Sequence, residues 1–124
     1  MQESMRTAIA ALLCTVASSA PAKTPIVRWS HAEASKKIYL GKCPVRLVFT
    51  GTILTARKGD FTFAWKRSDG FVGRSRTIHA TRRVQGWRVH DEWELSSTTS
   101  GWAQLWIQSE PHAPAVARFQ VRCK

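Results

Sequence analysis

The stretch CPVRLVFTGTI, residues 43–53, decides the fold class of this chain. Val45, Leu47, Phe49 and Ile53 are apolar, and most of the residues between them are polar. Because successive side chains of a strand point to opposite faces, this period of two predicts a strand that is buried on one face.

The same alternation recurs along the chain, with turn sequences such as SDG between the repeats. We expect further strands in residues 61–66, 74–84, 86–95, 102–108 and 115–123. Residues 24–30 and 36–41 could each add an edge strand, and residues 30–37 predict one helical turn between them. A chain of about seven short strands with almost no helix is typical of an all-β, two-sheet sandwich.

The first 22 residues have the pattern of a secretory signal peptide. Arg6 precedes an apolar stretch, and small residues follow, so that cleavage after Ala22 is expected. Met1 and Met5 are both possible starts. The predicted division is a signal peptide in residues 1–22, an N-terminal arm or edge strands in 23–42, and the sandwich in 43–124. We therefore expect a secreted or periplasmic protein without a transmembrane segment in its mature chain.

Two cysteines, Cys43 and Cys123, remain after removal of the signal, which takes Cys14 away. An even pair without metal-ligand spacing in an oxidising compartment predicts a disulfide bond. The bond would close a loop of about 81 residues and stabilise the fold by roughly 4.5 kcal/mol through loop entropy. The alternative is a pair of free buried thiols.

Short motifs along residues 43–123 carry a resemblance to a known family. They are Cys-Pro followed by FTGTI, Trp65, KRSDG at 66–70, Trp-x-Leu at 93–95, Gly-Trp at 101–102 and a final Phe-x-Val-x-Cys. Together they resemble small immunoglobulin-like or fibronectin-like modules of exported bacterial proteins, most of them uncharacterised. The resemblance implies an immunoglobulin-like β-sandwich and brings no catalytic residues with it. The predicted disulfide differs from that of antibody domains, which crosses between facing sheets.

No enzyme motif is present, so we expect no catalytic residues, no metal and no cofactor. The four histidines, His31, His79, His90 and His112, are scattered without zinc-ligand spacing. An enzyme centred on His79, His90 and neighbouring acids is the remaining catalytic hypothesis.

Asp91 falls on the apolar side of its predicted strand, between Val89 and Trp93. A buried unpaired carboxylate is costly, so we expect Asp91 to pair with an arginine such as Arg67 or Arg76.

The positive charge is the strongest functional observation. The net charge is +11, and it does not change when the signal is removed, because Glu3 and Arg6 leave together. An anion-binding patch is predicted if the cations in the middle of the chain share neighbouring strands. Its candidate residues are Lys66, Arg67, Arg74, Arg76, Arg82, Arg83 and Arg88. The alternative is a solvated basic face that keeps the protein soluble.

The six tryptophans divide into two groups. Trp65, Trp87 and Trp93 lie on the apolar side of their predicted strands and are expected in the core. Trp102 and Trp106 share a face opposite Leu105. Core packing at a sheet edge is the favoured interpretation for this pair, and an exposed contact surface for sugar or protein is the alternative.

These features predict an exported, non-catalytic binding or accessory module. Its expected partner is an anionic envelope polymer or an acidic protein, and no nucleic-acid partner is expected, because no DNA- or RNA-binding motif is present. The alternative function is a small inhibitor or effector of a secreted hydrolase, presenting a loop such as KRSDGFVGRSR. The sequence indicates neither the oligomeric state nor the type of cell envelope.

Overall fold

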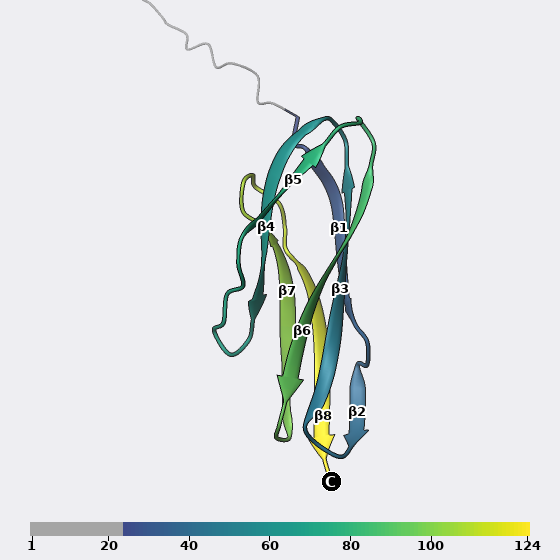
Figure 1. The fold of residues 1–124 in the computed structure, drawn as a ribbon, viewed down its shortest axis with the longest axis vertical. Helices are drawn as coiled ribbons and strands as arrows, with labels where there is room; N and C mark the ends of the chain where they lie inside the picture. The colour runs from purple at the N-terminus through teal and green to yellow at the C-terminus, as the bar shows by residue number, and fades with distance from the viewer. Residues whose placement is uncertain (1–23) are drawn as a thin grey trace, which may run out of the picture.

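The alternating apolar residues form the inner faces of two β-sheets packed on each other (Figure 1). The computed structural model describes residues 24–124, and the predicted signal peptide therefore lies outside the described residues. No helix is found among the described residues, and the all-β prediction is confirmed. The strands are β1 (Val27–Ala34), β2 (Ile38–Gly41), β3 (Val45–Thr55), β4 (Gly59–Arg67), β5 (Arg76–Ala80), β6 (Gly86–Leu95), β7 (Thr99–Ile107) and β8 (Ala115–Cys123).

One sheet has three strands in the order β1-β3-β6, and the other has five in the order β2-β8-β7-β4-β5. All neighbouring strands are antiparallel except β2 and β8, which run parallel. This two-sheet arrangement is an immunoglobulin-like sandwich, as expected. The described part of the chain holds no helix of the length and apolar character needed to cross a membrane.

The core lies between the sheets and is built from the residues that the alternation selects. Leu47, Phe49 and Ile53 of β3 are fully buried in the same cluster as Phe61 and Phe63 of β4. Burial of each such side chain stabilises the fold by about 1.5–3 kcal/mol. The three tryptophans expected in the core pack there: Trp65 is buried, and Trp87 and Trp93 are partly buried against the cluster.

The predicted disulfide is formed. Cys43 precedes β3 of the three-stranded sheet, and Cys123 ends β8 of the five-stranded sheet, with 5.4 Å between their Cα atoms. The bond therefore ties the two sheets together, across a sequence separation of 80 residues. The expected contrast with antibody domains is wrong on this point, because the bond here also joins two sheets, although Cys43 lies just before its strand.

The predicted helical turn in residues 30–37 is wrong. Residues 30–34 belong to β1, where Ser30 is the partner of Ile53 and Ala34 the partner of Phe49. The physical reason is tertiary: Ala32 is buried in this pairing, and the strand gains a ladder of hydrogen bonds that a single helical turn lacks. β1 and β2 form an edge of the three-stranded and of the five-stranded sheet, respectively.

The loop before β8 fixes the start of β1. The carboxylate of Glu110 accepts hydrogen bonds from the backbone N–H groups of Ile26 and Val27, at 3.0 and 2.8 Å. His112 forms a further side-chain hydrogen bond with Ser30, at 2.9 Å. The first strand is thus held by side chains as well as by its ladder to β3.

The loop between β4 and β5 turns at the SDG sequence, as expected. Gly70 has a φ of 96°, a conformation that favours glycine, and its N–H donates to the carbonyl of Arg67 at 2.9 Å. The N–H of Phe71 donates to the side chain of Asp69 at 3.0 Å. Residues 68–73 are therefore a hydrogen-bonded loop with defined side-chain positions.

Candidate functional site

The two outer faces of the sandwich differ in the residues they carry. On the five-stranded sheet, the outward positions of β7 are held by Trp102, Gln104 and Trp106, while Ala103 and Leu105 point into the core. Trp102 and Trp106 are partly exposed and lie outside the core cluster. The favoured expectation of core packing for this pair is therefore wrong, because strict alternation along β7 gives the inner face to the smaller side chains.

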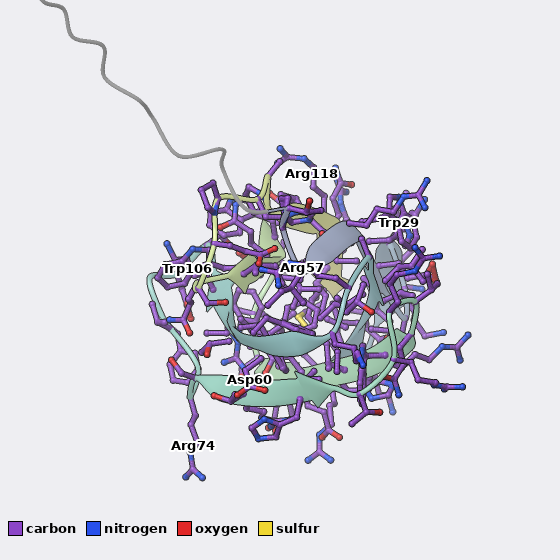
Figure 2. All side chains as sticks on the ribbon, turned by 90° about the horizontal axis from the view of Figure 1, so that it is seen from above. Trp29, Arg57, Asp60, Arg74, Trp106 and Arg118 are labelled. Atoms are coloured by element: carbon purple, nitrogen blue, oxygen red, sulfur yellow. A yellow bond between two sulfur atoms is a disulfide. The ribbon has the colours of Figure 1, made fainter. Side chains whose placement is uncertain are left out.

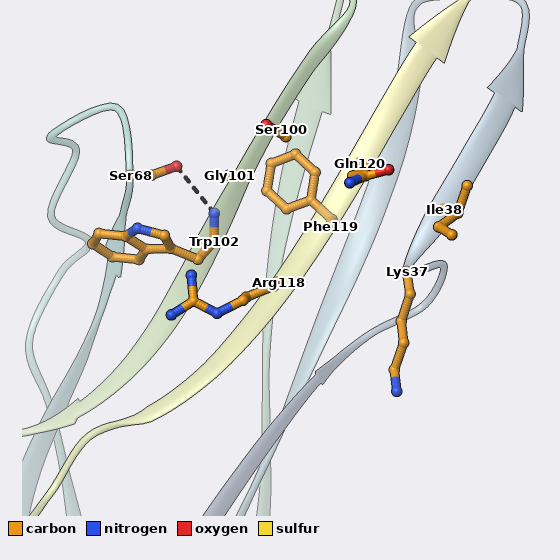
Figure 3. A pocket seen from close by; sticks show the side chains of 9 residues that line it. All are labelled: Lys37, Ile38, Ser68, Ser100, Gly101, Trp102, Arg118, Phe119 and Gln120. Atoms are coloured by element: carbon orange, nitrogen blue, oxygen red, sulfur yellow. Dashed lines mark hydrogen bonds between the residues drawn. The ribbon is translucent and has the colours of Figure 1, made fainter.

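A shallow groove of about 560 Å³ lies on this outer face (Figure 3). It crosses from the loop after β4, over β7 and β8, to the start of β2. Its lining residues are Lys37, Ile38, Ser68, Ser100, Gly101, Trp102, Arg118, Phe119 and Gln120. Four chain segments thus contribute to one surface, which only the folded sheet brings together.

Two hydrogen bonds fix Ser68 against β7 at one side of the groove. The N–H of Ser68 donates to the carbonyl of Trp102 at 3.0 Å, and the N–H of Trp102 donates to the Ser68 hydroxyl at 3.1 Å, the bond drawn in Figure 3. Gly101 makes this approach possible, because a Cβ at this position would overlap the Ser68 hydroxyl. The groove wall is consequently part of the fold and is formed before any ligand binds.

The charge of the groove is positive. Of its nine lining residues, Lys37 and Arg118 are charged, and within residues 24–124 neither has a carboxylate at salt-bridge distance. Arg118 is the cross-strand partner of Trp102, and the two side chains lie close together in Figure 3. Such a pair offers a flat apolar ring beside a planar donor, which suits a sugar ring that carries a carboxylate or phosphate.

Trp106 lies further along β7 on the same face. The ammonium group of Lys66 stands 3.8 Å from the centroid of its ring, within cation–π distance. Lys66 is the cross-strand partner of Gln104, so the second tryptophan also has a cation beside it. The outer face therefore repeats the combination of tryptophan and basic side chain.

The structure does not bring the seven predicted anion-binding cations into one patch. Lys66 lies on the outer face of the five-stranded sheet, whereas Arg88 lies on the outer face of the three-stranded sheet. Arg74 projects from the loop before β5 (Figure 2), where Arg76 begins the strand. Arg82 and Arg83 lie in the loop between β5 and β6, so the predicted set covers several surfaces.

Arg67 is not available to an external anion. Its guanidinium donates to both carboxylate oxygens of Asp91, at 3.1 and 3.2 Å, and to the carbonyl of Glu92. The guanidinium also lies over the rings of Phe71 and Trp93. The predicted pairing of Asp91 with an arginine is confirmed. Through this ion pair, Arg67 links β4 of the five-stranded sheet to β6 of the three-stranded sheet.

Of the nine residues that line the groove, only Trp102 was predicted from the sequence as a candidate contact residue. The charged and polar residues that were missed include Lys37, Ser68, Arg118 and Gln120. One signal could have found two of them, because alternation along β8 places Arg118 and Gln120 opposite the buried Ala117 and Phe119. The parallel pairing of β2 with β8, which brings Lys37 to the groove, leaves no local signal in the sequence.

The histidines proposed for a catalytic centre are not brought together. His79 lies on the outer face of the five-stranded sheet, where its ring is 2.7 Å from the carboxylate of Asp60. His90 lies on the outer face of the three-stranded sheet as the partner of Thr50. Within residues 24–124, no group of three side chains has the geometry for a metal ion.

Comparison with known proteins supports the fold alone. No family model matches the chain, and no curated protein matches it. Among solved structures, the CARDB domain of a Pyrococcus furiosus protein, determined in complex with two metal ions, is similar with a TM-score of 0.58 and 10% identity. That likeness covers 82% of this chain and 100% of the domain.

A β-glucosidase from Erythrobacter marinus is similar with a TM-score of 0.58 and 8% identity over 77% of this chain. The chain spans 15% of the length of that enzyme. At these identities the two likenesses establish one thing: the chain has the fold of an immunoglobulin-like β-module.

Proposed function

We propose that this protein is an exported, non-catalytic module that binds an anionic polysaccharide of the cell envelope on the outer face of its five-stranded sheet. The groove between Ser68 and Lys37 carries the proposal, because it combines a partly exposed tryptophan with two cations and has no carboxylate among its lining residues. The disulfide between Cys43 and Cys123 supports an oxidising location, either secreted or periplasmic.

The chemistry of the face favours an acidic glycan over a simple ion. Trp102 offers an apolar surface for the C–H face of a sugar ring, and Ser100 and Gln120 offer hydrogen-bonding groups beside it. Arg118 and Lys37 then complement a carboxylate or phosphate on the same or the next sugar. A flat, open groove suits a long polymer that continues past both ends of the site.

Retention by an anionic polysaccharide tests this function. We expect the protein to be retarded in a native gel that contains polygalacturonate and to run freely in a gel that contains neutral dextran. Trp102→Ala should lose most of the retardation, whereas Trp29→Ala, on the opposite outer face, should keep it. Equal retardation of both variants would contradict the proposed site.

A second candidate function, inhibition of a secreted hydrolase, is favoured by the loop between β4 and β5. Phe71 and Val72 follow its turn at residues 68–70 and are each 50% exposed. The loop is nevertheless ordered, because the N–H of Arg67 donates to the carbonyl of Phe71 and the N–H of Gly73 donates to that of Trp65. A hydrogen-bonded loop with exposed apolar side chains loses little conformational entropy when it binds in a protein cleft.

The two functions predict different complexes. An inhibitor forms a stoichiometric complex with one enzyme that persists at high salt and is lost in Phe71→Ala. A polysaccharide-binding module is retained by polyanions, is released by salt and is unaffected by Phe71→Ala. A pull-down from envelope extract at low and high salt, with the unmodified protein and with Phe71→Ala, distinguishes the inhibitor from the polysaccharide-binding module.

A further inference from the structure

Strand β2 carries two apolar side chains that the sandwich does not cover. Ile38 is 73% exposed and Leu40 is 61% exposed, more than any other large apolar side chain in the described residues. Both belong to the outer face of the five-stranded sheet, where their partners on β8 are Gln120 and Arg122. Strand β2 is an edge of this sheet, so one side of it faces solvent.

Basic residues surround these two side chains. Lys36 and Lys37 precede β2, Lys42 follows it, and Arg122 and Lys124 lie at the end of β8. We call these five cations with Ile38 and Leu40 the β2 strip. No acidic residue occurs in residues 35–42 or 115–124.

The strip is held firmly on the sheet. The N–H of Gln120 donates to the carbonyl of Lys37, and the N–H of Lys124 donates to the carbonyl of Gly41, both at 2.8 Å. The strand is bonded to β8 at both of its ends, beside the disulfide at Cys123. The two apolar side chains are therefore displayed on a rigid edge at one end of the molecule (Figure 1).

Three kinds of partner could cover such a strip: a second copy, a protein cleft or an anionic lipid surface. A second copy is disfavoured, because a symmetric contact would place two sets of five cations against each other. A lipid surface accepts protruding aliphatic side chains in its interface, and its phosphates complement the surrounding lysines and arginines. The charge and the protruding shape therefore favour the lipid surface over a narrow protein cleft.

We propose that the β2 strip binds anionic membrane surfaces, with Ile38 and Leu40 entering the headgroup region and the five cations contacting lipid phosphates. This contact would hold the neighbouring groove close to the membrane, because Lys37 and Ile38 also line the groove. The inference goes beyond polysaccharide binding and does not rest on it.

Sedimentation with vesicles tests the inference. The purified mature protein should bind vesicles that contain phosphatidylglycerol, and it should bind pure phosphatidylcholine vesicles far more weakly. Leu40→Ser should reduce partitioning by about tenfold, since full burial of an aliphatic side chain is worth about that factor. Lys36→Gln with Lys42→Gln should reduce it by roughly fivefold per charge.

Val84→Ser is the matched control. Val84 is 54% exposed and follows Arg82 and Arg83, in a loop at the opposite end of the sandwich from β2 (Figure 1). This variant removes a similar aliphatic side chain beside two cations, and its vesicle binding should equal that of the unmodified protein. Thermal unfolding of each variant checks that the fold is retained, which the exposure of these side chains predicts.

Three results would overturn the inference: equal binding to neutral and anionic vesicles, unchanged binding of Leu40→Ser, or an equal loss in Val84→Ser. A dimer that Leu40→Ser dissociates, without vesicle binding, would assign the strip to a second copy instead. Leu40 does not line the groove, so Leu40→Ser should still be retarded by polygalacturonate. Loss of vesicle binding with retained polysaccharide binding thus separates this inference from the proposed function.

Discussion

The two outer faces of the sandwich have the same alternating strand pattern but differ in how their basic side chains are balanced by acidic ones. On the three-stranded sheet, Arg46 and Arg88 are matched by Glu33, Glu92 and Glu94, and Arg46 lies 3.5 Å from Glu92. On the five-stranded sheet, Lys66, Arg118 and Arg122 are opposed by one carboxylate, that of Asp60, which lies beside His79.

This difference teaches that net charge alone does not locate a binding surface. The chain is basic throughout, but the acids are concentrated on one sheet and the tryptophan pair with its cations on the other. Figure 2 shows Trp106 and Trp29 on opposite sides of the molecule. The contrast between the faces, more than the total charge, supports the five-stranded sheet as the binding surface.

The largest expected effect comes from removing the disulfide bond that joins the two sheets. Cys43→Ala with Cys123→Ala should lower the free energy of unfolding by about 4 kcal/mol, because the unfolded chain regains the freedom of a long closed loop. Chemical denaturation of the oxidised protein and of the double variant measures this difference. An unchanged unfolding midpoint would show that the bond does not stabilise the sandwich.

The next largest effect concerns the edge where the two sheets meet. Arg67→Ala leaves the carboxylate of Asp91 without its partner, and the side chains of both residues are less than one fifth exposed. We expect a loss of about 2–4 kcal/mol in the free energy of unfolding.

Arg46→Ala provides the control for this ion pair. It breaks the pair with Glu92, whose side chains are 63% and 60% exposed, and should cost less than about 1 kcal/mol. Similar losses in the two variants would contradict the structural role of Arg67.

A smaller effect should distinguish the tryptophans of the two faces in ligand binding. Trp102→Ala should weaken the binding of an oligogalacturonate by about tenfold, the size of a typical hot-spot residue. Trp29 is 48% exposed on the other face, stacked on His31, and Trp29→Ala should bind with unchanged affinity. Isothermal titration calorimetry at low salt measures both affinities.

The smallest effect is electrostatic. Arg118→Gln should weaken polygalacturonate binding at low salt, by about fivefold, and the difference should shrink as salt screens the charge. Arg88→Gln on the opposite face carries the same charge change. If Arg88→Gln weakens binding equally, the protein attracts polyanions by its overall charge and not through the groove.

The sandwich could be predicted because the alternation within each strand identifies its buried face, through residues such as Leu47, Phe49 and Phe61. The sequence also predicted the pairing of Asp91, because a carboxylate on an apolar face requires a partner. The groove escaped prediction because it depends on strand order: the parallel contact of β2 with β8 places Lys37 near Arg118. The position of Trp102 was misjudged because alternation alone does not tell which face of β7 is the inner one.

The central claim is that the five-stranded outer face binds an acidic glycan, and nuclear magnetic resonance tests it most directly. Oligogalacturonate titrated into the ¹⁵N-labelled protein should shift the indole signal of Trp102 and the amide signals of Ser68, Arg118 and Gln120. The signals of Trp29, His31 and Arg88 should stay in place. Shifts confined to those three residues, or no shifts at all, would contradict the account.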